Sequence, residues 1–446
     1  MSWRAVRLGE LVDNFSVRAK DVGGADGLDF FGVSNEEGII KTKYAAEDKA
    51  EDYKIIEKDC FAYNPYRVNV GSIGFVGNDT KGLISPAYVV FKIKQNSIIP
   101  ELLFKFLKSD EGLNQIKFYA RGTVRQALRF EDLCNIEITI PKYEEQKILY
   151  SKLIKSQEAS KVLDTELKNQ IELVKKLRQQ LLQDAVQGKL LPQNTSRKLS
   201  GETGSELLKK IKAEKAKLIA EKKIKKEKEL PPIKPEEIPF EIPDNWVWCR
   251  LGEICSIKGG KRVANGYKLL KEPTPHIYIR VSDMKNGTVD DSDLHYLDET
   301  MFQKIKQYTI SKEDIYMTIV GGTIGKCGLI PDIFDNMNLT ENAAKISPIL
   351  VDKVYLWKCL DSPFCQDQFI DKTKQVGVQK MALNRFSCSL IPLPPLSEQN
   401  RIVEKLDELM QYCDNLEESI KESQAQNEKL LQQVLREALR KEEVKK

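Results

Sequence analysis

The chain has 446 residues, of which 41% are hydrophobic, 8% aromatic and 30% charged, and its 70 basic and 66 acidic residues leave a net charge of +4. This much apolar material suffices for two or three cores and excludes a disordered or collagen-like chain. The net charge is too small to indicate nucleic-acid binding by itself, so any phosphate-binding surface must be local or shared with partners.

No uninterrupted apolar run of about 18 residues predicts a membrane span, and no apolar segment follows the two arginines near the start of the chain as in a secretory signal. We therefore expect a cytoplasmic protein that contacts no membrane. The nine cysteines form no Cys-x-x-Cys pair, and His276 and His295 are the only histidines. This composition predicts reduced core thiols and no metal site.

Residues 1–140 are predicted to form a first domain of mixed α/β structure. Alternating apolar runs at 88–93 and 136–140, bounded by turn-forming residues, predict short strands, and 102–107 predicts a short helix.

Residues 141–187 predict a long helix, because no Gly or Pro falls between 142 and 187 and apolar residues advance by three or four. Forty-odd residues at about 1.5 Å each span roughly 65 Å, which requires a long partner. Gly188 and Pro192 end the helix. Its predicted seam consists of Leu163, Leu167, Ile171, Val174, Leu177 and Leu181.

Residues 188–243 are predicted as a charged and proline-rich linker. Ten lysines and five glutamates at 206–229 can form a solvated amphipathic helix, and five prolines at 231–243 predict an extended spacer. The lysines could also contact phosphates, an alternative that the sequence leaves open.

The rest of the chain restates the first part, so the protein is a tandem duplication. Trp3, Arg7 and Leu8 return as Trp246, Arg250 and Leu251, and further matches preserve their order. The duplication predicts a second mixed α/β domain at 244–393 and a second long helix at 394–446. Its seam consists of Ile402, Leu406, Leu409, Cys413, Leu416 and Ile420.

Each long helix has a partner of matching length in the other, which predicts an antiparallel coiled coil and a pseudo-twofold internal repeat. A coiled coil between two chains remains an alternative. Gln424 and Asn427 interrupt the second seam, either as a register device or as a surface for another protein.

Catalytic motifs fail on inspection, so we predict that the chain itself is not an enzyme. Gly325 and Lys326 resemble the end of a phosphate-binding P-loop, but Cys327 stands where Ser or Thr must ligate magnesium. Asn64-Pro65-Tyr66 resembles an amino-methyltransferase motif without its second proline. Two histidines cannot form a metal or general-base cluster.

A duplicated body, each copy followed by a Pro-x-x-x-Glu-Gln helix, resembles the specificity subunit of type I restriction-modification systems. The strongest motif is Pro-Leu-Pro-Pro-Leu-Ser-Glu-Gln at 392–399, and 140–146 carries a weaker form. The resemblance covers essentially the whole chain. It implies two target-recognition domains, each reading one half of an asymmetric bipartite site in double-stranded DNA, separated by two spacer helices.

The resemblance also implies that the helices dock two methyltransferase subunits and that restriction and translocase subunits join the complex. S-adenosylmethionine, magnesium and ATP are expected on those partners, so we expect no cofactor-binding, metal-binding or catalytic residue in this chain. Antiparallel helices would give the two domains a pseudo-twofold axis that matches the dyad of DNA, with helix length setting the half-site spacing. A coiled-coil scaffold without DNA specificity is the alternative function.

Reading bases requires Arg or Lys opposite guanine and Asn or Gln opposite adenine. In the first domain the candidates beside the Gly71 and Gly122 turns are Tyr66, Arg67, Asn69, Arg121, Thr123, Arg125, Gln126 and Arg129. In the second domain the corresponding candidates are Lys326, Lys374, Gln375, Gln379, Lys380, Asn384 and Arg385.

Overall fold

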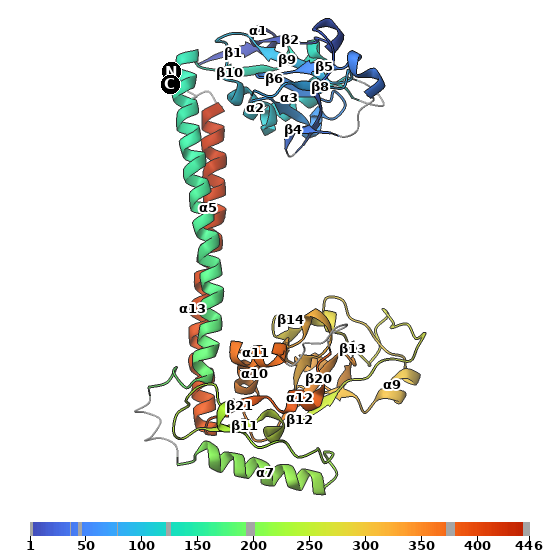
Figure 1. Cartoon of the computed structure of the whole chain (residues 1–446), viewed down its shortest axis with the longest axis vertical. Coiled ribbons are helices and arrows are strands. Elements are labelled where there is room, and N and C mark those ends of the chain that lie inside the picture. The colour runs from blue at the N-terminus through green and yellow to red at the C-terminus, as the bar shows by residue number, and fades with distance from the viewer. Residues whose placement is uncertain are drawn as a thin grey trace. The chain divides into compact units, whose positions relative to one another are not determined.

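The structure of the chain is a computed structural model that describes residues 3–35, 37–42, 47–77, 79–121, 126–192, 201–371 and 380–439. The chain divides into two compact units. Unit 1 comprises Met1–Leu167 with Glu422–Lys446, and unit 2 comprises Lys168–Lys421. Each unit contains one globular domain and part of each long helix (Figure 1).

Domain 1, residues 3–140, is built on two four-stranded sheets. The first has the order β2-β9-β6-β7, with antiparallel strands Val12–Asn14, Val89–Ile93, Cys60–Tyr63 and Ile73–Phe75. The second has the order β4-β3-β8-β5, with strands Gly38–Lys41, Asp29–Ser34, Gly82–Ile84 and Lys54–Ile56, and its β3 and β8 run parallel. β1 (Arg4–Arg7) and β10 (Glu137–Ile140) pair antiparallel and close the domain.

The sequence of β6 shows why the first sheet lies in the middle of domain 1. Its side chains alternate between two cores, since successive residues of a strand point to opposite faces. Phe61 and Tyr63 join the core that includes the helices, whereas the smaller Cys60 and Ala62 join the core that includes residues of the second sheet. Phe61 stacks on Phe91 of the neighbouring β9 with 4.9 Å between ring centroids.

The helices of domain 1 are α1 (Leu8–Leu11), α2 (Pro100–Lys108), α3 (Asp110–Tyr119) and α4 (Phe130–Leu133). α2 begins with a proline, whose fixed φ and missing N–H suit the first helical position, and it buries four apolar residues. α3 begins after Ser109, whose hydroxyl accepts a hydrogen bond from the Gly112 N–H at 3.2 Å.

Domain 2, residues 244–393, repeats this plan. Its main sheet has the order β12-β20-β17-β18, with strands Cys255–Gly259, Ala343–Pro348, Ile315–Thr318 and Cys327–Leu329. A second sheet has the order β13-β19-β16, with strands Tyr278–Ile279, Met337–Leu339 and Thr309–Ile310, and β11 (Val247–Arg250) pairs with β21 (Leu390–Leu393). The same strand order in both main sheets confirms the predicted duplication.

The described residues of domain 2 also form a small hairpin and five α-helices. The hairpin pairs β14 (Met284–Lys285) with β15 (Thr288–Val289). The helices are α8 (Leu251–Ile254), α9 (Glu299–Ile305), α10 (Lys353–Asp361), α11 (Pro363–Asp371) and α12 (Leu383–Ser387). Short 3-10 helices across the chain are Ala19–Asp21, Glu47–Asp52, Val68–Val70, Pro235–Glu237, Val281–Asp283, Gly321–Thr323 and Asp332–Phe334.

The two long helices are α5 (Tyr143–Val186) and α13 (Leu396–Leu439), and they pack against each other within one chain. In unit 1, Val434 packs against the cluster that contains Leu153, and Asn427 Nδ2 donates to the Ser160 carbonyl at 3.0 Å. A step of seven residues forward along α5, from Leu153 to Ser160, therefore corresponds to a step of seven residues backward along α13, from Val434 to Asn427. This correspondence confirms the antiparallel pairing. The Asn427 bond supports the interpretation of this residue as a register device.

In unit 2 the packed residues differ from the predicted seam. Arg178 Nη2 lies 2.7 Å from Asp414 Oδ1 and 3.0 Å from Glu417 Oε2. On α5 the next partly buried residue after Val174 is Arg178, four residues later, whereas the sequence predicted Leu177, three residues later. On α13 the next one after Cys413 is likewise Glu417, whereas the sequence predicted Leu416. The ion pair lets these two charged residues occupy the interface.

The twelve residues of the predicted seam differ in burial, and three of them contradict the prediction. Six of its residues are buried: Leu167, Val174, Ile402, Leu406, Cys413 and Ile420. Three are half-buried: Ile171, Leu181 and Leu409. The prediction is wrong for three exposed residues: Leu163, Leu177 and Leu416, which are 45%, 43% and 50% exposed.

Residues 201–243 pack on domain 2 and are not a free spacer. α7 (Gly204–Ala220) begins after Thr203, whose hydroxyl accepts from the Glu206 N–H at 3.2 Å, and it buries Leu207 and Ile211. The ammonium group of Lys215 donates to the carbonyls of Gly252 and Cys255 near the end of α8. The predicted amphipathic helix forms, but its apolar side is covered.

The segment after α7, residues 221–243, is called the strap. Its Glu237 carboxylate accepts two hydrogen bonds from Arg250 Nη2, at 2.9 and 2.8 Å, and Arg250 Nη1 donates to the Cys388 carbonyl at 2.9 Å. Phe240 packs edge-on against Trp248 with 5.1 Å between centroids. The strap is thus fastened to domain 2 by charge-assisted hydrogen bonds and by an aromatic contact.

Within the ranges given above, no helix combines the length and the apolar character needed to cross a lipid bilayer.

Candidate nucleic-acid interface

In domain 1 the chain leaves β6 at Tyr63 and enters a tight polar turn. The Asn64 side chain accepts a hydrogen bond from the Tyr66 N–H at 3.0 Å, and the Asn64 carbonyl accepts from the Arg67 N–H at 3.0 Å. Asparagine is suited to this position because its amide can replace a backbone acceptor in a turn. Gly71, with φ of 87°, ends the short helix that follows. The turn therefore presents Tyr66 and Arg67 outward.

A second segment, which follows α3 in the chain, lies next to this turn. Arg121 and Ala127 exchange backbone hydrogen bonds of 3.0 and 2.8 Å, which close the base of a loop. The Leu128 N–H donates to the Pro65 carbonyl at 3.0 Å and joins this loop to the turn after β6. The predicted residues Thr123 and Arg125 lie outside the described residues.

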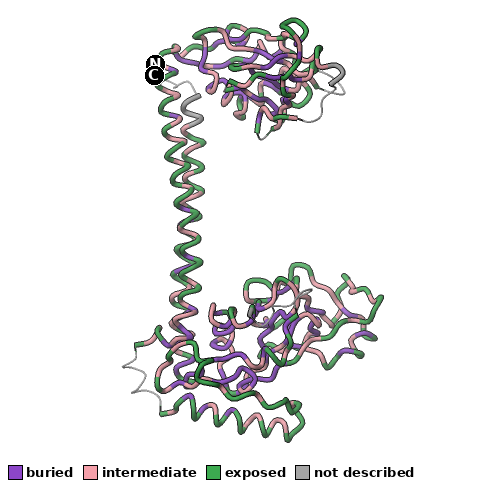
Figure 2. The backbone as a smooth tube through the Cα atoms, viewed as in Figure 1, coloured by how far each residue is buried: buried purple, intermediate pink, exposed green. Residues whose placement is uncertain are grey.

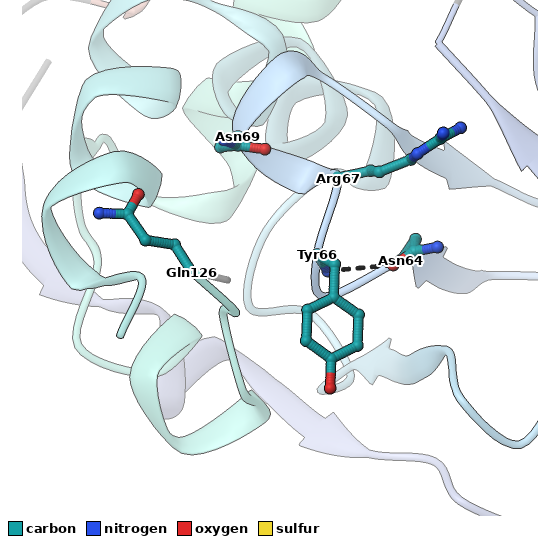
Figure 3. A pocket seen from close by; sticks show the side chains of 5 residues that line it. All are labelled: Asn64, Tyr66, Arg67, Asn69 and Gln126. Atoms are coloured by element: carbon teal, nitrogen blue, oxygen red, sulfur yellow. Dashed lines mark hydrogen bonds between the residues drawn. The ribbon is translucent and has the colours of Figure 1, made fainter. Parts of the chain in front are cut away.

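Four of the predicted residues and one other line a single open cavity of about 380 Å³: Asn64, Tyr66, Arg67, Asn69 and Gln126. Tyr66 is 54% exposed, and Arg67 and Gln126 are also exposed. Figure 3 shows Gln126 entering from the loop, while the Arg67 side chain extends away on the other side. Asn and Gln amides can pair with adenine edges and an arginine with guanine, so this concave polar surface suits base edges and phosphates.

The two remaining candidates of domain 1 have different roles in the fold. Arg121 Nε lies 2.9 Å from Asp132 Oδ1, and the Asp132 side chain is almost fully buried. Arg121 thus ties the loop to α4, a contact that the prediction of a free base-reading side chain did not include. Arg129 is exposed just before α4.

Domain 2 places its candidates at the corresponding position after β17. Gly321 and Gly325, with φ of 82° and 92°, shape the turn that follows this strand, and Lys326 is exposed at its end. The Met381 N–H donates to the Ile319 carbonyl at 2.8 Å, and Lys380 lies opposite Val320 in a β-bridge. The segment that begins at Lys380 is therefore joined to the turn after β17, just as Leu128 is joined to the turn after β6 in domain 1.

The other candidates of domain 2 lie on or before α12. Asn384 and Arg385 are exposed on this helix. The predicted residues Lys374, Gln375 and Gln379 lie outside the described residues. The structure thus brings Lys380 beside the turn that ends at Lys326, and α12 continues the same segment.

Asn64 was not among the predicted residues, although it lines the cavity. Its signal in the sequence was the Asn-Pro pair directly after a strand, which is typical of a turn with an outward side chain. The sequence analysis noted that pair only as an incomplete methyltransferase motif.

The Glu-Gln motif proves to fix each long helix to its own domain. Gln146 is 1% exposed; its Oε1 accepts from the Ile99 N–H at 2.9 Å and its Nε2 donates to the Pro141 carbonyl at 3.0 Å. In domain 2, Gln399 makes the equivalent bonds to the Asp352 N–H at 2.9 Å and the Pro394 carbonyl at 3.0 Å. A hydrogen-bonded buried amide holds one orientation, so each domain is rigidly connected to the start of its long helix.

The cysteine thiols, the strongest potential nucleophiles of the chain, are mostly buried. Seven of the nine cysteines are buried, and all nine are free thiols. Burial raises the pKa of the Cys60 thiol to about 11 and raises the pKa of Cys249 well above its usual range. These groups therefore stay protonated at neutral pH. In the described part of the chain, no three His, Cys, Asp or Glu side chains are grouped as metal ligands.

Comparison with known families gives two matches. A family model described as the type I restriction modification DNA specificity domain matches residues 2–181 and again residues 243–424. Each match contains one globular domain and part of the long helix that follows it.

Curated relatives carry the same description. The type I restriction enzyme EcoAI specificity subunit of Escherichia coli is 36% identical over 254 residues, covering 55% of this chain and 41% of that protein. The EcoEI specificity subunit of Escherichia coli is 28% identical, covering 56% of this chain and 42% of that protein. The chain thus matches only about two fifths of the length of these two relatives. The EcoDI specificity subunit is 22% identical over 99% of this chain and 88% of that protein.

Solved structures share the fold. The HsdS subunit from Thermoanaerobacter tengcongensis has a TM-score of 0.58 at 19% identity, covering 98% of this chain and 96% of that chain. A chain from a study of complex assembly and conformational transition in a type I R-M system also has a TM-score of 0.58, at 20% identity, covering 98% of this chain and 97% of that chain. At these identities the likeness concerns the fold alone.

Proposed function

Because the chain belongs to the type I restriction modification DNA specificity family, we propose that it is the DNA-reading subunit of such a system. Domain 1 reads one half of a bipartite site in double-stranded DNA, and domain 2 reads the other half. The observation that carries the proposal is the equivalent turn after β6 and after β17, each joined by a backbone hydrogen bond to a segment that carries other candidate residues.

Sequence-specific recognition needs donors held rigidly against base edges, while phosphate contacts set the register of the complex. Asn69 and Gln126 have the side-chain amides that pair with adenine, and Arg67 has the fork that pairs with guanine. In domain 2 these roles fall to Asn384 and Arg385, with Lys326 and Lys380 suited to phosphates or guanine. The two surfaces differ in composition, so the recognised site is asymmetric.

The chain supplies recognition and leaves the chemistry to partners. The outer faces of α5 and α13 carry exposed apolar residues, among them Leu173 at 60% and Leu430 at 60% exposure, and a partner subunit could cover them. We propose two methyltransferase subunits as these partners, with restriction and translocase subunits completing the complex. S-adenosylmethionine, magnesium and ATP bind to those partners, and the complex works in the cytoplasm.

Methylome sequencing of the source cells, with and without this gene, tests the proposal. The expected result is that one asymmetric bipartite adenine-methylation motif disappears with the gene and returns with a plasmid copy. Loss of no motif, or loss of a continuous rather than a bipartite motif, contradicts the proposal. Retention of every motif together with loss of a protein complex would instead indicate a scaffold.

A further inference from the structure

Four lysines in the strap have no assigned role. Lys222, Lys225, Lys226 and Lys228 are exposed, and none forms a side-chain ion pair with another described residue. They are called the basic extension. Figure 2 shows this region and the outer side of α7 as exposed.

Other lysines of the same segment are neutralised by acidic neighbours. Lys210 lies 2.5 Å from Glu202, Lys223 lies 2.8 Å from Glu221, and half-buried Lys215 lies 3.0 Å from Glu227. The pairing neutralises Glu221 and Glu227, two glutamates that would otherwise offset the basic extension, and Glu229 remains beside it. The positive charge is therefore concentrated at one end of the segment.

The basic extension leads into a segment of the strap that lies near the end of α12. Gly252 of α8 lies between the strap and α12, because a Cβ built on it would meet Leu230 of the strap at 3.1 Å and Ser387 of α12 at 2.9 Å. Arg250 binds the carbonyls of Pro231 and Cys388 with the same guanidinium, at 3.3 and 2.9 Å. The lysines thus end two residues before a segment fixed to α12, the helix that carries Asn384 and Arg385.

We propose that the basic extension binds phosphates of the DNA duplex, without sequence preference, beside the half-site read by domain 2. This inference rests on the proposed function, since it extends the surface assigned there to α12. Lysine suits the role because its ammonium is a compact charge on a flexible stem, which contacts phosphates but lacks the planar fork that reads guanine. Asn, Gln and Arg are absent from residues 221–230, so base reading there is not expected.

DNA fits the basic extension better than a membrane surface does. A membrane-binding helix presents apolar side chains next to its basic ones. Here the neighbouring apolar residues Leu218, Ile224 and Leu230 are half-buried, and Leu218 and Ile224 pack against the core of domain 2. The proposal therefore commits to duplex DNA as the partner.

The test measures DNA binding by fluorescence anisotropy at several salt concentrations, with the full chain in complex with its methyltransferase subunits. Two duplexes are compared, one carrying the methylated site and one of scrambled sequence. Each phosphate contact adds about 0.9 to the slope of log affinity against log salt concentration. For Lys225→Gln with Lys226→Gln and Lys228→Gln we expect the slope to fall by about 2 to 3 on both duplexes, with the ratio of the two affinities unchanged.

A matched control removes the same charge from paired lysines of the same segment. Lys210→Gln with Lys217→Gln and Lys223→Gln should lower the slope by less than about 1, because these ammonium groups already have carboxylate partners. The conservative replacement of the three test residues by Arg should keep the wild-type slope.

The proposal is overturned if the test variant keeps the wild-type slope, if the control lowers it equally, or if only the affinity for the methylated site changes. Loss of an acidic protein from the complex without a change in slope overturns it too. Failure of the proposed function has a different signature, since the wild-type complex would then bind both duplexes equally. The slope on scrambled DNA still decides the present inference in that case.

Discussion

Arg7 and Arg250 occupy the same position in the two repeats, but their surroundings differ. Arg250 is 5% exposed, and its guanidinium is enclosed by the strap and by the Cys388 carbonyl. The Arg7 side chain is 64% exposed and contacts Glu137 at 3.5 Å. The two repeats therefore share the same arrangement of strands and helices, whereas the segments that pack over this arrangement differ between the two copies.

The recognition turns show the same division. Both follow the equivalent strand and receive a backbone hydrogen bond from the segment that carries other candidate residues. The turn of domain 1 is organised by the Asn64 side chain and lines a cavity, while that of domain 2 is shaped by Gly321 and Gly325. Equivalent backbones thus present different side chains, which is the arrangement that two unlike half-sites require.

The largest expected effect is the separate loss of each half-site. Asn69→Ala with Gln126→Ala should relax the bases read by domain 1, because each bidentate contact is worth about 1–3 kcal/mol of discrimination. Lys380→Ala with Asn384→Ala should relax the other half instead. Methylome sequencing of both double variants measures the outcome. If either variant, still folded, degrades both halves equally, the assignment of one domain to one half-site is wrong.

The contrast between the two arginines predicts a difference in stability. Arg250→Ala should lower the free energy of unfolding of domain 2 by about 3 kcal/mol, because buried carbonyls lose their donor. Arg7→Ala removes an exposed pair and should cost well under about 1 kcal/mol. Urea unfolding followed by tryptophan fluorescence measures both, since Trp3 lies in domain 1 and Trp246, Trp248 and Trp357 lie in domain 2. Equal losses for the two variants would show that the strap contributes nothing to Arg250.

Substitutions in the two Glu-Gln motifs should destabilise the two domains equally, in contrast to the unequal effects expected for the two arginines. Gln146→Ala and Gln399→Ala should each cost about 2 kcal/mol, because each leaves a buried backbone N–H and a carbonyl without a partner. Gln179→Ala, exposed on α5, is the matched control and should leave stability unchanged. A large effect in one repeat and none in the other would argue against a common anchoring role.

Regular features of the scaffold could be predicted from the sequence, because they depend on local patterns. The alternating apolar runs at 88–93 and 136–140 identify β9 and β10, and the lack of Gly and Pro identifies α5. The spacing between successive interface residues of the long helices could not be predicted from such local patterns. Steps of three and four both suit a helix, and the Arg178 ion pair that selects a step of four joins residues distant in sequence.

The recognition surface shows the same limit. Side-chain chemistry and turn signals identified Tyr66, Arg67, Asn69 and Gln126, which the fold brings into one cavity. The attachment of Arg121 to Asp132 and the packing of the strap on Arg250 depend on tertiary contacts that no local pattern encodes.

The smallest expected effect is a difference in acid sensitivity caused by the strap. The pKa of Glu237 is lowered, first by a hydrogen bond from the Lys234 N–H and then by Arg250. A carboxylate with a lowered folded-state pKa stabilises the fold above its unfolded pKa of about 4.3, and this contribution is lost as the pH falls through the lower folded-state value. The strap should therefore loosen below about pH 4.

Trp248 reports this change because it packs against Phe240 of the strap. In the wild-type chain its fluorescence should change over that pH range before the domain unfolds, whereas Glu237→Gln should abolish the early change. Glu236→Gln is the control, because Glu236 is exposed beside Glu237 and should leave the profile as it is. An identical acid profile for Glu237→Gln and wild type would mean that the neutral strap is held as firmly as the charged one. Packing of Phe240, rather than the Arg250 ion pair, would then be what distinguishes domain 2 from domain 1.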